Sequence, residues 1–288
     1  MVEVTARKLT ESYVVPDVAG RMAARIRDKE HAGGYDAIQS SAALAKALTE
    51  DIRSVSHDLH TYVLYSYGVI RDPPQRRPEV PLAPPSGAIR SNFGFRRLEI
   101  LDGNVGYIDL RSFVKPAFAA HTAAAAMNFV ANSDALILDL RHNQGGDGGM
   151  VRLLCSYFFG STPVHLADGY QREGNQTEEI WTLPDVPGAR YVAKPVFILT
   201  SRQTFSAAEA LAYALQALKR AVIVGERTAG GAYGGGRQSI NAHFDLLLST
   251  SRTVNAVTKT DWEGTGVQPD VPVPADRALD IALAKARP

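Results

Sequence analysis

Residues 195–211 read PVFILTSRQTFSAAEAL, an apolar run, a polar turn and then a run rich in alanine and leucine. The apolar run predicts a buried strand, and 210–218 predicts a helix. Ser206 therefore stands at a strand–turn–helix junction, where a hydroxyl can meet the positive end of a helix. Serine is also an ordinary capping residue there, so the turn alone favours a cap over a nucleophile. A nucleophilic serine needs a base to take its proton, which other parts of the chain would have to supply.

Composition indicates a globular protein and excludes several classes of function. The chain has 288 residues, with 45% hydrophobic and 21% charged side chains, which suits a folded core. A formal net charge of +1 argues against nucleic acid or an anionic membrane as the main binding partner. Metal spacing of Cys and His is absent, as is a GxxxxGK[ST] phosphate loop, so we expect no metal and no cofactor.

Further features bear on compartment and cysteine chemistry. Residues 1–10 alternate charged and apolar side chains and do not form a signal peptide, and no run is long enough to span a bilayer. The sequence leaves the compartment open between the cytoplasm and export after loss of a leader, and it does not indicate an oligomeric state. Cys155 is the one cysteine, so no internal disulfide forms; its apolar surroundings predict a core residue rather than a nucleophile.

The chain divides into three predicted parts: a helical domain at 1–66, a proline-rich linker at 67–92 and an α/β core domain at 93–288. In the first part, Pro16 opens a helix to about His31, Ser40 and Ser41 cap a second helix, and Tyr62–Tyr67 predicts a strand. The second part holds six prolines between 73 and 85 and is predicted to be extended.

Alternating strand-like and helix-like stretches in the third part are typical of a layered α/β domain. The predicted strands are 98–101, 104–110, 135–140, 221–225, a hairpin over 239–252 and an extended piece at 267–273. The predicted helices are 116–132, 150–159 and 275–286, and the glycine-dense stretch 228–236 is predicted to be a loop.

A glycine-rich turn, RHNQGGDGG at 141–149, follows the predicted strand that ends near Asp139. Glycines after a buried strand can aim backbone N–H groups at an anion. Gly145 or Gly146, together with the N–H of Ala207 after the serine, could form an oxyanion hole. A simple chain reversal is an equally good interpretation of the turn taken alone.

Two other stretches offer a base and an acid. His57 and His60 lie at a predicted helix-to-strand junction, where an imidazole can face a cleft and titrate near neutral pH. Glu263 lies between aromatic and glycine residues and could orient an imidazole and favour its cation. Taken alone, each has a plainer interpretation, a surface or capping histidine and a solvated loop acid.

Together these stretches resemble the C-terminal processing (tail-specific) serine peptidases, with a closer match to the branch of the tricorn core and the interphotoreceptor retinoid-binding protein. The resemblance runs from about Tyr13 to Ala286. It rests on the joint order of YVVP at 13–16, GYD at 34–36, SHDLH at 56–60, VGY at 105–107, DLRHNQGG at 139–146, TSRQTFSAAE at 200–209, VGERT at 224–228 and GTGVQPD at 264–270.

The resemblance implies a crotonase-like α/β core preceded by a small helical domain, without a PDZ domain. It places the nucleophile at Ser206 and the oxyanion hole near Gly145 or Gly146. The processing branch uses a lysine as base, but Gly231 occupies that position here, which excludes a Ser–Lys dyad at this position. The tricorn-like arrangement fits instead, with His60 as base, His57 in reserve and Glu263 as its orienter.

The predicted function is that of a serine hydrolase, with a peptidase as the first choice. It acts through an acyl-enzyme on a peptide or small acyl substrate. Two alternatives stay open: a non-enzymatic carrier of a retinoid-like or fatty apolar ligand, and a biosynthetic acyl-transforming enzyme on the same fold.

Overall fold

The computed structural model describes residues 1–70 and 83–287. The predicted linker, 67–92, falls in large part on 71–82, which lie outside the described residues; of the remainder, Ser86–Arg90 form α4 and Asn92–Gly94 a 3-10 turn, η1. Contacts group the chain into two compact units that are not continuous in sequence: 1–80 with 169–178 and 233–253, and 81–168 with 179–232 and 254–288. The predicted division at 66 and 93 stays a prediction. None of the described helices is both long and apolar enough to cross a membrane.

The first unit begins with three helices. These are α1 (Val2–Ser12), α2 (Pro16–His31) and α3 (Ser41–Ser56), followed by β1 (Tyr62–Tyr65). Proline is preorganised for the first turn of α2, and the Ser40 hydroxyl accepts a hydrogen bond from the Ala43 N–H at 3.2 Å to cap α3. The predicted helical start of the chain is confirmed, and α1 adds a helix whose bounds the sequence did not indicate.

A sheet contributes strand residues to this unit: all of β1 and β9, and the parts of β10, β5 and β6 that lie within 233–253 and 169–178. Its strand order is β1-β10-β5-β6, and β9 pairs with β10. The bounds are β9 (Tyr233–Asn241), β10 (Phe244–Asn255), β5 (His165–Gln171) and β6 (Gln176–Trp181). Apolar side chains of the helices and of β10 form one core; they include Leu9, Met22, Ile26, Leu48, Ile52, Leu246 and Leu248.

The predicted loop at 228–236 is wrong at its end, because β9 already begins at Tyr233. Glycine serves packing here rather than loop formation. A Cβ on Gly235 would lie 1.8 Å from the Leu248 carbonyl oxygen of the neighbouring strand, so only glycine allows that close approach.

The second unit contains a sheet with the order β11-β8-β7-β4-β3-β2. All neighbours are parallel except β2 and β3, which are antiparallel. The bounds are β2 (Phe95–Leu101), β3 (Val105–Leu110), β4 (Ala135–Asp139), β7 (Val196–Thr200), β8 (Val222–Gly225) and β11 (Val271–Pro272). Every residue of β3, β4 and β7 is buried, which explains why these strands are predominantly apolar.

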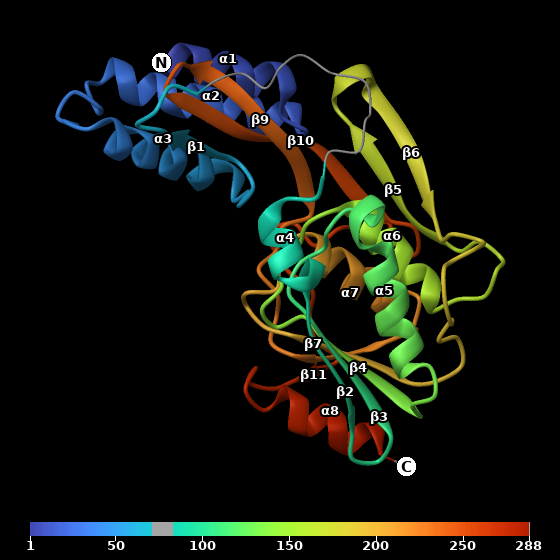
Figure 1. Ribbon diagram of the computed structural model, residues 1–288. Coiled ribbons are helices and arrows are strands. Elements are labelled where there is room, and N and C mark those ends of the chain that lie inside the picture. The colour runs from blue at the N-terminus through green and yellow to red at the C-terminus, as the bar shows by residue number, and fades with distance from the viewer. Residues whose placement is uncertain (71–82, 288) are drawn as a thin grey trace. The chain divides into compact units, whose positions relative to one another are not determined.

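Helices cover both faces of this sheet, as Figure 1 shows. On one side lies α8 (Ala278–Ala286), packed on alternate strand residues such as Tyr107, Ile137 and Leu199. On the other side lie α5 (Pro116–Val130), α6 (Gly148–Tyr157) and α7 (Ala207–Ala217). The layered α/β fold class predicted from the sequence is confirmed. Because β4 and β7 are parallel neighbours, with Asp139 beside Leu199, the loops that leave their carboxyl ends lie next to each other.

Candidate active site

Ser206 has a strained backbone. It is the N-cap of α7, with φ 55° and ψ −120°, a region that residues with a side chain rarely adopt. Such a conformation costs about 1 to 3 kcal/mol and persists only where the surroundings impose it. A nucleophilic serine on a sharp turn between a strand and a helix shows the same kind of strain. The backbone therefore favours a nucleophile over a simple cap.

The glycine turn after β4 packs directly against Ser206. A Cβ on Gly145 would lie 2.8 Å from the Ser206 Cβ, 2.8 Å from the Ala207 nitrogen and 2.9 Å from the Phe205 oxygen. Gly145 also has φ 98°, which glycine tolerates best. The structure thus brings together Ser206, Ala207 and Gly145, which the sequence had placed in separate loops.

Asn143 ties these two loops together. Its backbone oxygen accepts from the Phe205 N–H at 3.0 Å, and its side-chain amide donates to the Leu110 oxygen at 2.9 Å. Its side-chain oxygen accepts from the Gly145 N–H at 2.8 Å. Asn143 is fully buried, so the register between the glycine turn and the serine turn is fixed from inside the protein.

Gly146 differs from Gly145 in where its N–H points. The Gly145 oxygen accepts from the Phe113 N–H at 2.9 Å, and a trans peptide directs the following N–H of Gly146 the opposite way. Within the described residues, the N–H groups of Gly146 and Ala207 donate no hydrogen bond. These two donors, rather than the Gly145 N–H, are therefore available to an incoming oxyanion.

Substituting Gly145 with alanine is expected to lower the rate of acylation roughly 100-fold, because the new methyl would push the serine turn out of place. The rate of reaction with a fluorophosphonate probe measures this. The matched control is Gly148→Ala, since a Cβ there meets no atom within 4 Å. Equal rates for the two variants would contradict the packing argument.

Glu263 belongs to a loop that is bound to the stretch where the family resemblance places a lysine. Its Oε2 accepts from the Ala232 N–H at 2.6 Å, and the Trp262 indole donates to the Gly231 oxygen at 2.9 Å. The Gly264 N–H donates to the Gly230 oxygen at 2.9 Å. Three contacts therefore hold the Glu263 loop against residues 230–232, the stretch in which Gly231 occupies the lysine position.

A buried ion pair lies where β4 ends and the glycine turn begins. Arg141 donates to the Asp139 carboxylate through two nitrogens, at 3.0 and 2.6 Å, and the Tyr107 hydroxyl donates to it at 2.7 Å. Burial works against ionisation, but the Arg141 fork and the tyrosine together hold the pKa of Asp139 below its usual range. Arg141 also donates to the Ala275 oxygen at 2.6 Å, so the pair ties the end of β4 and the start of the turn to the segment before α8.

His60 lies in the first unit, between α3 and β1. Its side chain is 22% exposed. Its backbone N–H donates to Asp58 Oδ1 at 2.8 Å, and Asp58 also accepts from the Thr61 hydroxyl at 2.7 Å, which holds the turn. Burial lowers the pKa of His60, while the Asp58 charge pulls it upward. A neutral imidazole at pH 7 is the form that a general base requires.

His57, the reserve candidate, has a different environment. It is the C-cap of α3, with φ 58°, and it is exposed. A residue in that left-handed conformation ends a helix, which accounts for its position without a catalytic role.

One group of side chains among the described residues is compact enough to hold an ion. Ligand atoms of His165, Asp168 and Glu179 lie within 4.8 Å of one another. However, His165 Nε2 is 2.9 Å from Asp168 Oδ1, and Lys259 lies 3.7 Å from the other carboxylate oxygen. Hydrogen bonding and an ion pair account for this cluster, which contains none of the candidate catalytic residues.

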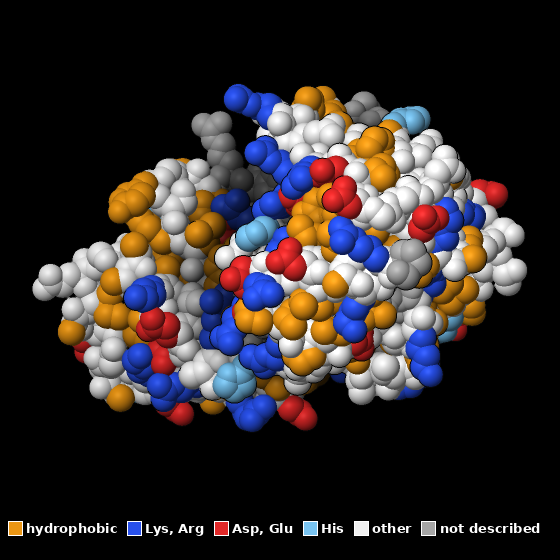
Figure 2. Space-filling view, turned by 90° about the horizontal axis from the view of Figure 1, so that it is seen from below, with side chains coloured by type: hydrophobic (Ala, Val, Ile, Leu, Met, Phe, Trp, Pro, Cys, Tyr) orange, Lys and Arg blue, Asp and Glu red, His pale blue; other side chains and the backbone are white. Residues whose placement is uncertain are grey.

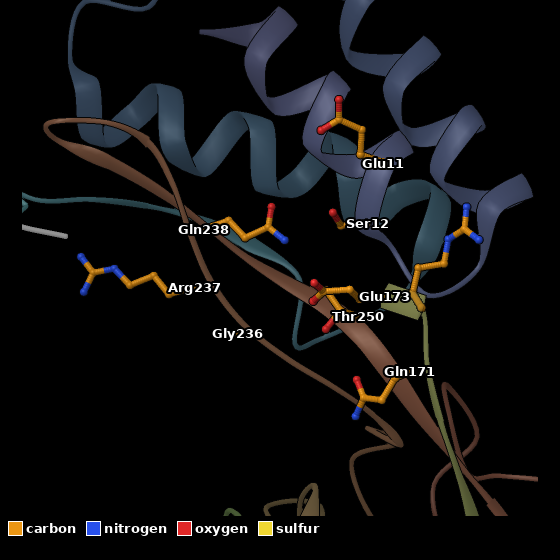
Figure 3. A pocket seen from close by; sticks show the side chains of 9 residues that line it. Glu11, Ser12, Gln171, Glu173, Gly236, Arg237, Gln238 and Thr250 are labelled. Atoms are coloured by element: carbon orange, nitrogen blue, oxygen red, sulfur yellow. The ribbon is translucent and has the colours of Figure 1, made fainter. Parts of the chain in front are cut away.

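Figure 3 shows a pocket of about 450 Å³ in the first unit. Except for Gly236, its lining residues have polar or charged side chains: Glu11, Ser12, Gln171, Arg172, Glu173, Gly236, Arg237, Gln238 and Thr250. None of the candidate catalytic residues lines this pocket. On the face seen in Figure 2, basic and acidic side chains both occur.

Comparison with known proteins identifies the family. The sequence profile of peptidase family S41 matches residues 104–273, the stretch that contains Ser206, the glycine turn and Glu263. The chain belongs to peptidase family S41. The profile of the N-terminal domain of peptidase S41 in eukaryotic IRBP matches residues 1–93 of this S41 chain, so the predicted family and branch are confirmed.

Relatives and folds agree with this assignment. The chloroplastic carboxyl-terminal-processing peptidase 2 of Arabidopsis thaliana is 30% identical over 178 residues, which are 59% of this chain and 32% of that protein. The carboxyl-terminal-processing protease of a Synechocystis strain is 35% identical over 129 residues, 44% of this chain and 28% of that protein. The chain thus spans about a third of the length of the curated relatives it matches. A putative peptidase from Parabacteroides merdae, 19% identical, has the same fold over 99% of this chain and 95% of its own, with a TM-score of 0.69.

One acid beside Ser206 in this S41 chain was not among the candidate residues from the sequence: Glu209. Its fully buried carboxylate accepts a hydrogen bond from the Ser206 N–H at 2.8 Å. The sequence did contain a pattern that could have indicated this bond. Serine followed three positions later by glutamate is the pattern of a capping box.

Proposed function

We propose that this S41 chain is a serine peptidase that forms an acyl-enzyme on Ser206. The observation that carries the proposal is the strained Ser206 at the start of α7, with the glycine turn packed against it and the N–H groups of Gly146 and Ala207 left for an oxyanion. A cap needs neither the strain nor the second loop. The family match and the named relatives, which are processing peptidases, support peptide as the substrate class.

In the proposed reaction, His60 takes the proton of Ser206 as its oxygen attacks the peptide carbonyl carbon. The C=O electron pair moves to oxygen, and the N–H groups of Gly146 and Ala207 hold that oxyanion. Each such donor contributes about 3 to 4 kcal/mol to the transition state. Glu263 stabilises the imidazolium, which then protonates the leaving amine, and water releases the acyl group. The lowered pKa of His60 supports its role as base, because the ring stays neutral at pH 7.

A fluorophosphonate probe tests the proposal directly. We expect one covalent adduct, located on the tryptic peptide 203–219, in which Ser206 is the one serine. An adduct on another peptide would show that the nucleophile is wrongly assigned. The absence of any adduct, together with an apolar ligand that extracts with the purified protein, would favour the carrier instead.

A further inference from the structure

Glu209 is bound by donors from two separate segments. Its Oε2 accepts from the Ser206 N–H at 2.8 Å and from the Gly231 N–H at 2.9 Å. Its Oε1 accepts from the Gly230 N–H at 2.7 Å and from the Thr228 hydroxyl. Glu209 is 0% exposed, so the bonds are made away from solvent. The carboxylate therefore joins the first turn of α7 to the loop that follows β8.

This arrangement demands a carboxylate rather than any polar side chain. Four donors converge on two oxygens, and only an ionised acid presents acceptors in all four directions. Burial raises the pKa of the Glu209 carboxyl, so the protein retains an acid whose ionisation burial opposes. An amide of the same shape would turn an N–H group toward two of the donors and leave them unsatisfied.

The loop held by Glu209 continues into the acid of the proposed site. Ala232 follows Gly231, and its N–H is bound by Glu263 at 2.6 Å. A chain of hydrogen bonds and one peptide segment thus runs from the Ser206 backbone through Glu209 to Glu263. The strain at Ser206 needs an outside constraint, and the Glu209 bond to its N–H is placed to supply one.

We infer that Glu209 is a positioning residue: its carboxylate locks the Ser206 turn and the Thr228–Gly231 loop into one rigid arrangement that sets where the nucleophile stands. It does not touch the substrate. The inference rests on the proposed function, since it says how the nucleophile of that same site is held.

The test is Glu209→Gln, with Glu178→Gln on exposed β6 as control. We expect the probe to react with the variant roughly 100-fold more slowly, as a displacement of about 1 Å causes. In peptide hydrolysis, kcat should fall and KM should stay the same, because no substrate contact is lost. A folded Glu209→Gln with the rate of the wild type would overturn the inference.

A second pair of variants covers the case in which Glu209→Gln does not fold. Thr228→Val removes one donor to Glu209, and also the acceptor that the Val267 N–H uses at 2.7 Å. We expect a loss of about tenfold in probe reaction rate, the effect of one hydrogen bond to a charged group. Thr228→Ser keeps the hydroxyl and should restore the rate. Equal rates for valine and serine would contradict the inference.

Hydrogen exchange separates failure of this inference from failure of the proposed function. Amides in peptides covering 206–209 and 228–232 should exchange faster in whichever of Glu209→Gln and Thr228→Val folds, and elsewhere in the second unit they should not change. This holds whether or not the protein reacts with the probe. Unchanged exchange in these peptides overturns the role of Glu209 even if Ser206 is the nucleophile.

Discussion

Substituting Ser206 with alanine is expected to lower peptide hydrolysis by about 10⁶-fold, the scale on which serine peptidases lose activity with their nucleophile. The fold should be unaffected, because alanine keeps the Cβ and the N–H that donates to Glu209 at 2.8 Å. Hydrolysis of a fluorogenic peptide and the circular dichroism spectrum measure the two effects. The exposed Ser161→Ala serves as control. Activity that persists in folded Ser206→Ala would place the nucleophile elsewhere.

Substitutions at position 206 also test whether the backbone of Ser206 is strained. Glycine populates positive φ without steric cost, so Ser206→Gly should unfold with a free energy about 1 to 3 kcal/mol higher than Ser206→Ala. Both variants lack the hydroxyl and should be inactive. Equal stability of the two would mean that the φ of 55° costs nothing in this protein.

The meeting of the two loops could be predicted from the sequence, because it follows from short-range patterns. Apolar runs ending at Asp139 and Thr200 indicate buried parallel strands, and parallel neighbours bring the turns after them to one edge. The same patterns failed at Tyr233, where glycines signal a loop but serve close packing of β9 on β10. Periodicity reports which face is buried, and it does not report how near a neighbouring backbone comes.

The proposed role of Glu209 could not be predicted from local sequence patterns, for a different reason. The capping-box spacing predicts the bond to the Ser206 N–H, which is local. The other three donors come from Thr228, Gly230 and Gly231, about twenty residues further on, and only the folded chain shows that they converge. For the same reason the sequence left Gly145 and Gly146 as equal candidates; the bond from the Gly145 N–H to Asn143 is seen only in the folded chain, and it supports Gly146 as the proposed donor.

The choice between His57 and His60 also required the structure, because the two are alike in type and lie three positions apart. His57 is exposed at the end of α3, while His60 is partly buried in the turn that Asp58 holds. Burial depends on contacts made by other parts of the chain, so no local pattern distinguishes them. The lowered pKa follows from that burial and favours His60 as the base.

Substituting His60 with alanine is therefore expected to reduce kcat/KM on the order of 10⁴-fold, the upper range for loss of a general base. His57→Ala is the matched control and should stay within about twofold of the wild type, as surface substitutions usually do. If His57→Ala has the larger effect, the base is wrongly assigned. If neither variant is affected, the His-type mechanism is wrong, although Ser206 could still be the nucleophile.

The pH profile of the wild type tests the same assignment without a mutation. A base works when it is neutral, and burial lowers the pKa of His60 below its ordinary value of 6.5. As pH falls, kcat/KM should therefore decline along a limb whose midpoint lies below 6.5, because activity is lost only as the folded pKa of His60 is crossed. In His60→Ala this acid limb should disappear from the residual activity. A limb that remains in the variant, or one centred above 6.5 in the wild type, would point to a titrating group other than His60.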